Sequence, residues 1–277
     1  MKDKPLFSLG ILGALVLLSF IGPLLYPWDP FTFHKELILT APSWQHPMGT
    51  DRLGRDLLAR VMQGGQVSLT IGVGSAVIAS LIGLLMGVTA GYFKGWWDKG
   101  FVLIVDLFLT FPTFFLLLTL VSYIPASSVI LIIVISITGW MGTARLIRSE
   151  SYRIASQPYI KILRIARVPT RTIVFKYFLP LLAPIFFVSF TFGVSGAILA
   201  ESGLSYLGLG ITPPEMSWGS ILSDGKSVME IAWWVSFFPG LMIFLVTFSL
   251  IQISDWLQDR ANRREMNLEG NRGSGRS

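Results

Sequence analysis

Cysteine is absent from the 277-residue chain, which excludes disulfide bonds, thiolate metal sites and cysteine nucleophiles. Histidine is nearly absent: His34 and His46 are the only two, and they lie in a segment without cysteine, so we expect no metal site. Charged residues make up only 14% of the chain, against about a quarter in a soluble domain. Hydrophobic residues make up 52%, and the mean hydropathy is +0.64. This composition predicts an integral membrane protein.

Long uncharged windows indicate where the chain crosses the bilayer, because a hydrocarbon core of roughly 30 Å needs about 20 apolar helical residues. The window 107–144 is too long for one crossing and contains Pro125 followed by serines, so we expect two spans joined by a short turn. The first span follows Lys2 and Lys4, but no small-x-small cleavage pattern follows it, which favours an uncleaved anchor over a secretory signal. We therefore predict an all-α integral membrane protein with six transmembrane helices near residues 6–26, 68–92, 101–123, 127–144, 177–200 and 231–254.

Lysine and arginine are distributed unevenly between the segments that join these spans. If the N-terminus is cytoplasmic, 17 of the 22 basic residues fall on the cytoplasmic side and 5 on the outer side. Because basic residues favour cytoplasmic loops, both termini are expected inside. The net charge of +6 then reflects contact with membrane lipid rather than a nucleic-acid partner. The predicted parts are an anchor helix and extracytoplasmic loop (1–66), a five-helix core (67–254) and a cytoplasmic tail (255–277).

The outer loop carries paired charges ahead of the second span. Thr50 or Asp51 can cap a helix in which Asp51 pairs with Arg55 and Asp56 pairs with Arg60, each acid four residues before its base. Leucines between them supply an apolar face. The segment predicts a short helix that lies on the outer leaflet.

The segment between the fourth and fifth spans is basic and amphipathic. Ser156 can cap a helix with Pro158 in its first turn, and Pro169 prevents its continuation, which predicts a helix of roughly three turns. Basic residues recur every three positions on it: Lys161, Arg164 and Arg167. Such a helix lies on the anionic inner leaflet or docks into a groove of a soluble partner, and the pattern leaves both open.

No combination of residues predicts catalysis. The segment from Gly219 to Ser227 superficially suggests a phosphate loop, but five residues rather than four separate Gly219 from Gly225. We expect neither enzymatic activity nor a cofactor bound by this chain. Asp106 is the single ionisable residue well inside a predicted span, and such residues commonly face a cavity or a partner. It is therefore a candidate for a transport path, although a place at the inner membrane interface explains it equally.

Three stretches together resemble the C-type permease subunits of bacterial peptide and nickel ABC importers. They are residues 46–56 (HPMGTDRLGRD), residues 110–112 (TFP), and residues 201–210 (ESGLSYLGLG) followed by 217–219 (SWG). The resemblance covers nearly the whole chain in the same order. It implies a type I importer fold in the bacterial inner membrane, a homologous B-type permease, two cytoplasmic ATPases that bind ATP and Mg²⁺, and an extracytoplasmic solute-binding protein. Peptides, nickel and metal chelates are all carried by such importers, so the substrate class stays open.

In that family a cytoplasmic E-A-A…G motif docks into the ATPase. Counting back from Leu179-Pro180 places the E-A-A on residues 161–163 and the glycine on Arg167, and this sequence differs at each of these positions. A basic residue stands in place of the acid, and we expect the glycine turn to be lost. The resemblance still implies docking through this helix, with these candidate residues: Tyr159, Lys161, Ile162, Leu163, Arg164 and Arg167.

The resemblance also implies residues of the translocation path. Candidates for the outer part, which faces the binding protein, are Glu201, Tyr206, Gly208 and Gly210, and candidates deeper in the membrane are Phe111, Pro112 and Asp106. A self-sufficient channel or secondary transporter would need several intramembrane ionisable residues or an inverted repeat. A scaffold that only recruits soluble proteins would tolerate any sequence in the outer turn. We therefore expect a permease subunit that forms half of a path and couples it to separate ATPases.

Overall fold

The computed structural model describes residues 5–124 and 126–274, and side chains up to residue 261. Lys2, Lys4, Pro125 and the last three residues of the predicted tail lie outside the described residues. Apart from one isolated bridge between Thr50 and Asp56, the regular structure of the described part is helical. The helices are α1 (Leu6–Phe20), α2 (Gly22–Leu25), η1 (Lys35–Leu37), α3 (Leu57–Phe93), α4 (Gly95–Thr110), α5 (Thr113–Ser122), α6 (Ser128–Ala155), α7 (Pro158–Ile165), α8 (Thr170–Ile173), η2 (Val174–Phe178), α9 (Leu179–Tyr206), α10 (Trp218–Gly225), η3 (Lys226–Val228) and α11 (Trp234–Ser274).

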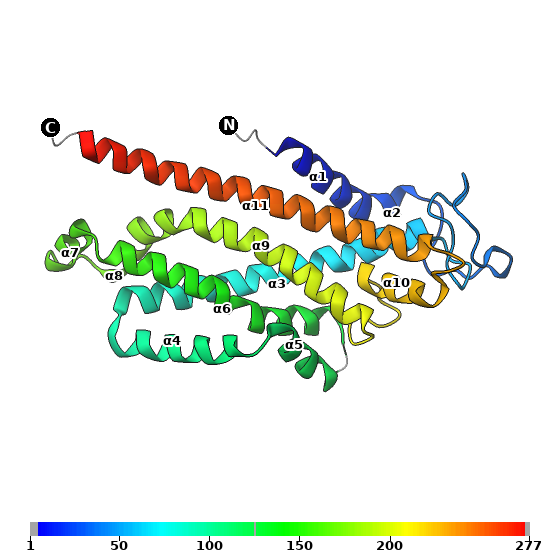
Figure 1. The fold of residues 1–277 in the computed structure, drawn as a ribbon, viewed down its shortest axis with the longest axis horizontal. Helices are drawn as coiled ribbons and strands as arrows, with labels where there is room; N and C mark the ends of the chain where they lie inside the picture. Colours follow the sequence, from blue (N-terminus) through cyan, green and yellow to red (C-terminus); the bar gives the residue numbers. More distant parts are fainter. Residues whose placement is uncertain (1–4, 125, 275–277) are drawn as a thin grey trace.

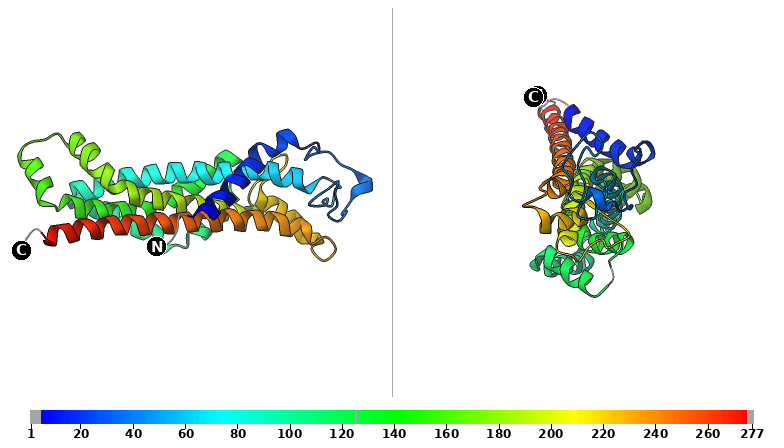
Figure 2. Two further views of the ribbon diagram at one scale, coloured as in Figure 1. Left: turned by 90° about the horizontal axis from the view of Figure 1, so that it is seen from above. Right: turned by 90° about the vertical axis from the view of Figure 1, so that its right-hand side faces the viewer.

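The long helices run lengthwise in an elongated bundle (Figure 1). α3 packs along α6 and α9, and α9 packs against α11. One end of the bundle carries α7, and we call it the α7 end. The other end carries α10 and the irregular segment 27–56, and we call it the loop end; Figure 2 shows the two ends well separated.

Apolar helices occupy all six predicted places, but they differ in length. Four helices of the described part are long and apolar enough to cross a membrane: Leu57–Phe93, Ser128–Ala155, Thr170–Tyr206 and Trp234–Ala261. A fifth crossing requires α4 and α5 together, and α1, with 15 residues, is shorter than the others. The chain is therefore a multi-pass membrane protein with four or five long spans and one short apolar helix.

The third predicted span, 101–123, is not a single helix. α4 ends at Thr110, α5 begins at Thr113, and the two axes differ by 80°. Phe111 is extended between them, because Pro112 disfavours a helical residue before it and cannot donate a backbone hydrogen bond. The candidate path residues Phe111 and Pro112 thus form a sharp bend, where the Phe111 side chain is exposed.

Several helices begin or end away from the predicted membrane boundaries. α6 continues to Ala155, well past the predicted end at residue 144, because a polar sequence can remain helical after its apolar part ends. The predicted interfacial helix at Thr50 is wrong: residues 51–55 are irregular, with Gly54 at φ 73°. Asp56 instead caps α3, since its carboxylate accepts a hydrogen bond from the backbone of Ala59 at 2.8 Å.

α3 packs closely against α6 along three glycines spaced four residues apart: Gly83, Gly87 and Gly91. A Cβ atom on Gly87 would lie 2.7 Å from the carbonyl oxygen of Ala144, closer than real atoms approach. Small residues at this spacing let two membrane helices meet backbone to backbone. The repeat is visible in the sequence, but which helix it packs against depends on the fold.

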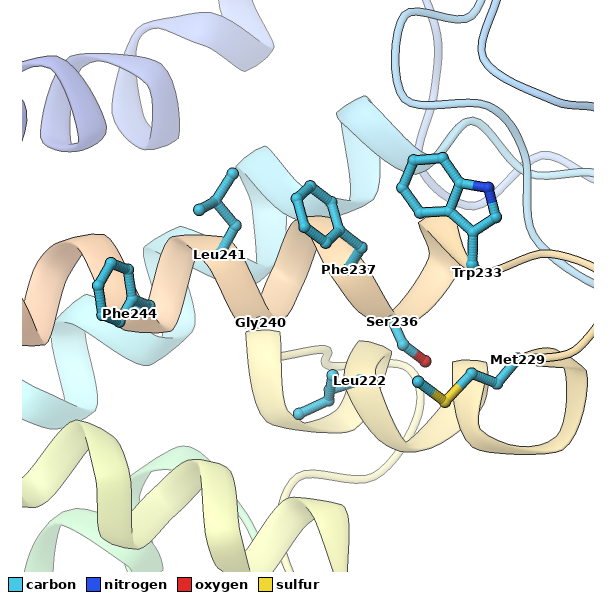
Figure 3. A pocket seen from close by; sticks show the side chains of 8 residues that line it. All are labelled: Leu222, Met229, Trp233, Ser236, Phe237, Gly240, Leu241 and Phe244. Carbon is cyan, nitrogen blue, oxygen red and sulfur yellow. The ribbon is translucent and has the colours of Figure 1, made fainter.

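An open apolar groove lies between α10 and α11 at the loop end (Figure 3). Its volume is about 460 Å³, and its side chains include Leu222, Met229, Trp233 and Phe237. Ser236 contributes the one hydroxyl of the lining. A surface of this composition suits acyl chains or another apolar helix rather than a hydrophilic solute.

Candidate functional site

The candidate coupling helix α7 extends over two turns rather than the predicted three. Ser156 does not cap it: Ser156 ends α6, and Gln157 precedes the first residue, Pro158. Ile160 faces the bundle and is completely buried. Ile162 and Ile165 are 64% and 82% exposed. α7 therefore presents an uncovered apolar face at the α7 end of the chain.

A left-handed turn ends α7 despite the missing glycine. Arg167 has φ 54°, the conformation that favours glycine. The backbone N–H of Val168 donates to the carbonyl of Leu163 at 3.1 Å, and that of Arg167 donates to Arg164 at 3.1 Å. These two bonds form a Schellman cap. The expectation that the glycine turn is lost is therefore wrong, because the turn persists with arginine in it.

The basic residues of α7 have different surroundings. The guanidinium of Arg164 donates to the backbone carbonyl of Tyr92 at 3.0 Å and lies 4.2 Å from the centre of the Tyr92 ring. Lys161 is exposed. Tyr159 is half-buried, with its ring 6.4 Å from that of Tyr177. Arg164 therefore joins α7 to α3.

Glu201 lies in a buried cluster of hydroxyl groups between α9, α3 and α10. The carboxylate is fully buried and accepts hydrogen bonds from Ser205 at 2.7 Å, Ser68 at 3.2 Å and Ser202 at 3.4 Å. Ser68 in turn accepts the backbone N–H of Trp218 at the start of α10, at 3.1 Å. These bonds hold three helices together at one point, which the sequence did not reveal, because Ser68 lies 133 positions from Glu201.

The predicted Gly208–Gly210 turn ends α9. Gly208 has φ 82°, and the backbone N–H of Leu209 donates to the carbonyl of Leu204 at 2.9 Å, again as in a Schellman cap. Gly210 lies against α9: a Cβ atom there would be 2.5 Å from the Cα of Ser205. Both glycines are required by geometry, Gly208 by its backbone angle and Gly210 by this contact. Tyr206, the last residue of α9, is 37% exposed, with the Lys226 ammonium 5.3 Å from its ring centre.

Asp106 has a partner on the neighbouring helix. It forms an ion pair with Arg145 of α6, and both side chains are about half exposed. A second pair nearer the α7 end joins Asp98 to Arg148, with one N–O distance of 2.8 Å. Asp106 belongs to this α4–α6 contact and not to the Glu201 cluster.

Charged side chains at the loop end pair differently from the predicted i,i+4 pattern. Asp51 does bind Arg55 at 2.7 Å, but it also binds Arg60 at 2.7 Å. The predicted Asp56–Arg60 pair is wrong, because Asp56 caps α3 and accepts from Tyr26 at 3.1 Å, with His46 2.7 Å away. The loop folds back over the start of α3, which brings these distant residues together.

Two groups at the loop end have shifted proton affinities: Tyr26, and Asp224 of α10, which pairs with Arg60 at 3.1 Å. Burial, with the neighbouring Asp56 carboxylate, raises the pKa of the Tyr26 phenol. Burial also raises the pKa of Asp224, against the opposing effect of Arg52 and Arg55. Within the described part of the chain, no three His, Asp or Glu side chains are placed to hold a metal ion.

Residues 69–266 match the family model of the binding-protein-dependent transport system inner membrane component. The match covers well over half of the chain. The chain belongs to this family. As a member of this permease family it is a multi-pass protein of the inner membrane and a transport subunit rather than an enzyme.

Curated relatives of this inner membrane component extend the match to nearly its whole length. An oligopeptide transport system permease protein OppC of Haemophilus influenzae is 32% identical over 260 residues, 93% of this chain and 84% of that protein. The OppC protein of Mycobacterium bovis is 35% identical over 90% of this chain and 87% of its own. A putative peptide permease protein of Brucella suis is 34% identical over 95% of this chain and 88% of its own.

A solved structure has the same fold. The MetNI methionine ABC transporter, in an inward-facing conformation, contains a chain that superposes with a TM-score of 0.56 and 16% sequence identity. The superposition covers 72% of this chain and 96% of that chain. The inner membrane component described here therefore has the type I importer permease fold.

Proposed function

We propose that this chain is a permease subunit of a peptide importer driven by ATP hydrolysis in separate subunits. The observation that carries this proposal is the similarity to peptide permeases over at least nine tenths of the chain. The chain forms half of the translocation path, and a homologous B-type permease forms the other half. It binds no cofactor itself; ATP and Mg²⁺ belong to two cytoplasmic ATPases.

The α7 end faces the cytoplasm in this proposal. The excess of basic residues at that end supports this orientation, because cytoplasmic loops are rich in lysine and arginine. Both termini are then cytoplasmic, and the loop end faces an extracytoplasmic solute-binding protein. The exposed Ile162 and Ile165 on α7 supply the apolar surface that an ATPase groove would cover.

In this proposal the residues predicted for the translocation path line it. The bend at Phe111 and Pro112 places irregular backbone at membrane depth, and the half-exposed Asp106–Arg145 pair places charged side chains there. Both are tolerated where they line a water-filled cavity or meet protein. Gly208 and Gly210 shape the turn at the loop end. A role for Glu201 in the path requires that its buried cluster open during transport.

Purification of the tagged chain from its native membrane tests the proposal. We expect a second permease and an ATPase in stoichiometric amounts, and uptake of labelled peptides in proteoliposomes that also contain the binding protein. The chain alone should show neither ATP hydrolysis nor uptake. A lone active oligomer would instead indicate a channel or secondary transporter, and an assembled but inactive complex would indicate a scaffold.

The substrate is tested on the binding protein encoded nearby. Calorimetry with dialanine, trialanine, tetraalanine and Ni²⁺ separates the two substrate classes that the resemblance implies. Micromolar or tighter binding of a peptide supports the proposal, and binding of Ni²⁺ alone contradicts it.

A further inference from the structure

α3 is a continuous helix that reaches both ends of the bundle. Its 37 residues span about 55 Å. At the loop end, Asp56 caps it and Arg60 joins it to Asp51 and Asp224. Eight residues beyond Arg60, Ser68 contacts the Glu201 cluster. A displacement of α3 along its axis would therefore act on both of these contacts.

The other end of α3 contacts the candidate coupling helix through Arg164. The carbonyl of Tyr92 is one of the last four of α3, which have no partner within a helix, and the Arg164 guanidinium donates to it at 3.0 Å. The positive charge also suits the negative C-terminal end of the helix dipole. The same guanidinium lies 4.2 Å from the centre of the Tyr92 ring.

Tyr92 is itself fixed in the bundle. Its side chain is buried, and its ring packs edge-on against Phe178 with 5.4 Å between centres. Ile160 of α7 belongs to the same buried cluster. Arg164 thus joins α7 to a residue that is packed firmly at the end of α3, so a displacement of Arg164 should displace α3 as well.

A second cation joins the end of α3 to the residues just before α7. Lys94, which ends α3 with φ 56°, places its ammonium 3.7 Å from the Tyr152 ring centre and 3.2 Å from the hydroxyl of Ser156. Ser156 is the C-cap residue of α6, directly before the connection to α7. The end of α3 is therefore joined on two sides to the segment that carries the coupling helix.

We propose that Arg164 is a positioning residue that joins the coupling helix α7 to α3 through Tyr92, so that movement of α7 is passed along α3 to the Glu201 cluster and the loop end. The inference rests on the proposed function, since it takes α7 as the helix that the ATPase moves. Arg164 acts on α3 and not on the solute.

The test uses the full complex of both permeases, the ATPases and the binding protein in proteoliposomes, with labelled dialanine, trialanine and tetraalanine as probes. In Arg164→Met we expect the ATPase to remain bound, while peptide imported per ATP hydrolysed falls about fivefold or more, the lower range of coupling between two sites. Tyr92→Leu removes the ring contact but keeps the backbone carbonyl, so it should lower the ratio less than Arg164→Met, and the double variant should fall no further than Arg164→Met. Arg164→Lys, which keeps the charge, should restore at least half of the ratio.

Arg171→Met, on the exposed cytoplasmic segment after α7, is the matched control and should leave the ratio unchanged. An unchanged ratio in Arg164→Met overturns the proposal, as do additive effects in the double variant. Loss of ATPase binding in Arg164→Met with normal behaviour of Tyr92→Leu also overturns it, because Arg164 would then contact the ATPase directly.

A second measurement separates this inference from the proposed function. Hydrogen exchange of residues 57–68 is compared in the assembled complex with and without ATP and vanadate. The difference seen in the parental complex should disappear in Arg164→Met. If no peptide is imported at all, the proposed function fails, and this comparison still decides the role of Arg164; equal responses in both complexes, or none in the parental one, overturn it.

Discussion

Val168 donates its backbone N–H to the carbonyl oxygen of Leu163 at 3.1 Å, and the residue before Val168, Arg167, has φ 54°. The turn after α7 therefore has the geometry that glycine adopts at least cost, although arginine occupies it. The hydrogen bonds that close the turn belong to the backbone, so they do not depend on the side chain.

Arg167→Gly should relieve this strain. A non-glycine residue in the left-handed region costs about 1–2 kcal/mol, part of which is offset by the greater freedom of glycine in the unfolded chain. We expect the apparent thermal midpoint of the purified complex to stay the same or to rise. Arg171→Gly, inside α8, is the matched control and should lower it, because glycine costs about 1 kcal/mol in a helix. A larger loss in Arg167→Gly than in the control would show that the arginine side chain is needed.

The sequence predicted the helical class, the places of the apolar helices and the existence of α7. These features depend on hydropathy, on proline positions and on helical periodicity, which are local. The sequence also identified residues 110–112 as a motif, but not that α4 and α5 would bend by 80° at Pro112. Proline indicates a break, while the bend angle depends on how the two segments pack.

The contacts of the candidate sites could not be predicted, because they join distant residues. Spacing predicts that Asp56 pairs with Arg60, yet its partners in the structure are His46 and Tyr26, which only the fold brings close to it. The resemblance implies that Glu201 lies on the translocation path, but no local pattern indicates that Ser68 is its partner. A prediction from spacing succeeds only where the chain is helical, and residues 51–55 are not.

Ile162→Ala should weaken the association of the ATPase with the complex. Ile162 is 64% exposed in this chain, so its truncation leaves the permease fold intact. Loss of a central interface anchor costs about 2 kcal/mol or more, about thirtyfold in affinity. Titration of the purified ATPase against the permease pair in nanodiscs measures this change.

Ile160→Ala provides the contrast on the same helix. Ile160 is fully buried against its own chain, and truncation of such a side chain costs about 2–5 kcal/mol of folding stability. We expect a lower thermal midpoint of the permease pair without any ATPase present. If Ile162→Ala binds the ATPase at the parental affinity, and crosslinks from exposed positions of α7 reach only lipid, α7 lies on the membrane surface instead.

Glu201→Ala should destabilise the complex. The substitution leaves the hydroxyls of Ser68, Ser202 and Ser205 without their acceptor, and each unsatisfied buried group costs about 1–3 kcal/mol. Glu201→Gln keeps an acceptor oxygen and should lose less than half as much. The apparent thermal midpoint of the permease pair measures both.

Ser249→Ala is the matched control for this cluster. Its hydroxyl is buried without a hydrogen-bond partner among the described residues, so its removal should be neutral or stabilising. If Glu201→Ala keeps the parental midpoint but transports poorly, the carboxylate acts on the solute and not as a link between helices.

Substitution of Gly208 or Gly210 by valine should abolish transport while membrane insertion and assembly stay near normal, because insertion depends on the apolar spans.

The two glycine positions should differ in their response to smaller substitutions. A Cβ on Gly208 meets no atom of the described residues within 4 Å, so Gly208→Asn, which tolerates positive φ, should retain most activity. At Gly210 a single Cβ already lies 2.5 Å from the Cα and the backbone nitrogen of Ser205, so Gly210→Ala must displace the turn. Peptide uptake at equal amounts of assembled complex should therefore be highest in Gly208→Asn, lower in Gly210→Ala and absent in both valine variants. Parental uptake in both valine variants would mean that the turn only connects two helices, and equal losses in Gly208→Asn and Gly210→Ala would mean that backbone freedom, rather than the contact with Ser205, limits transport.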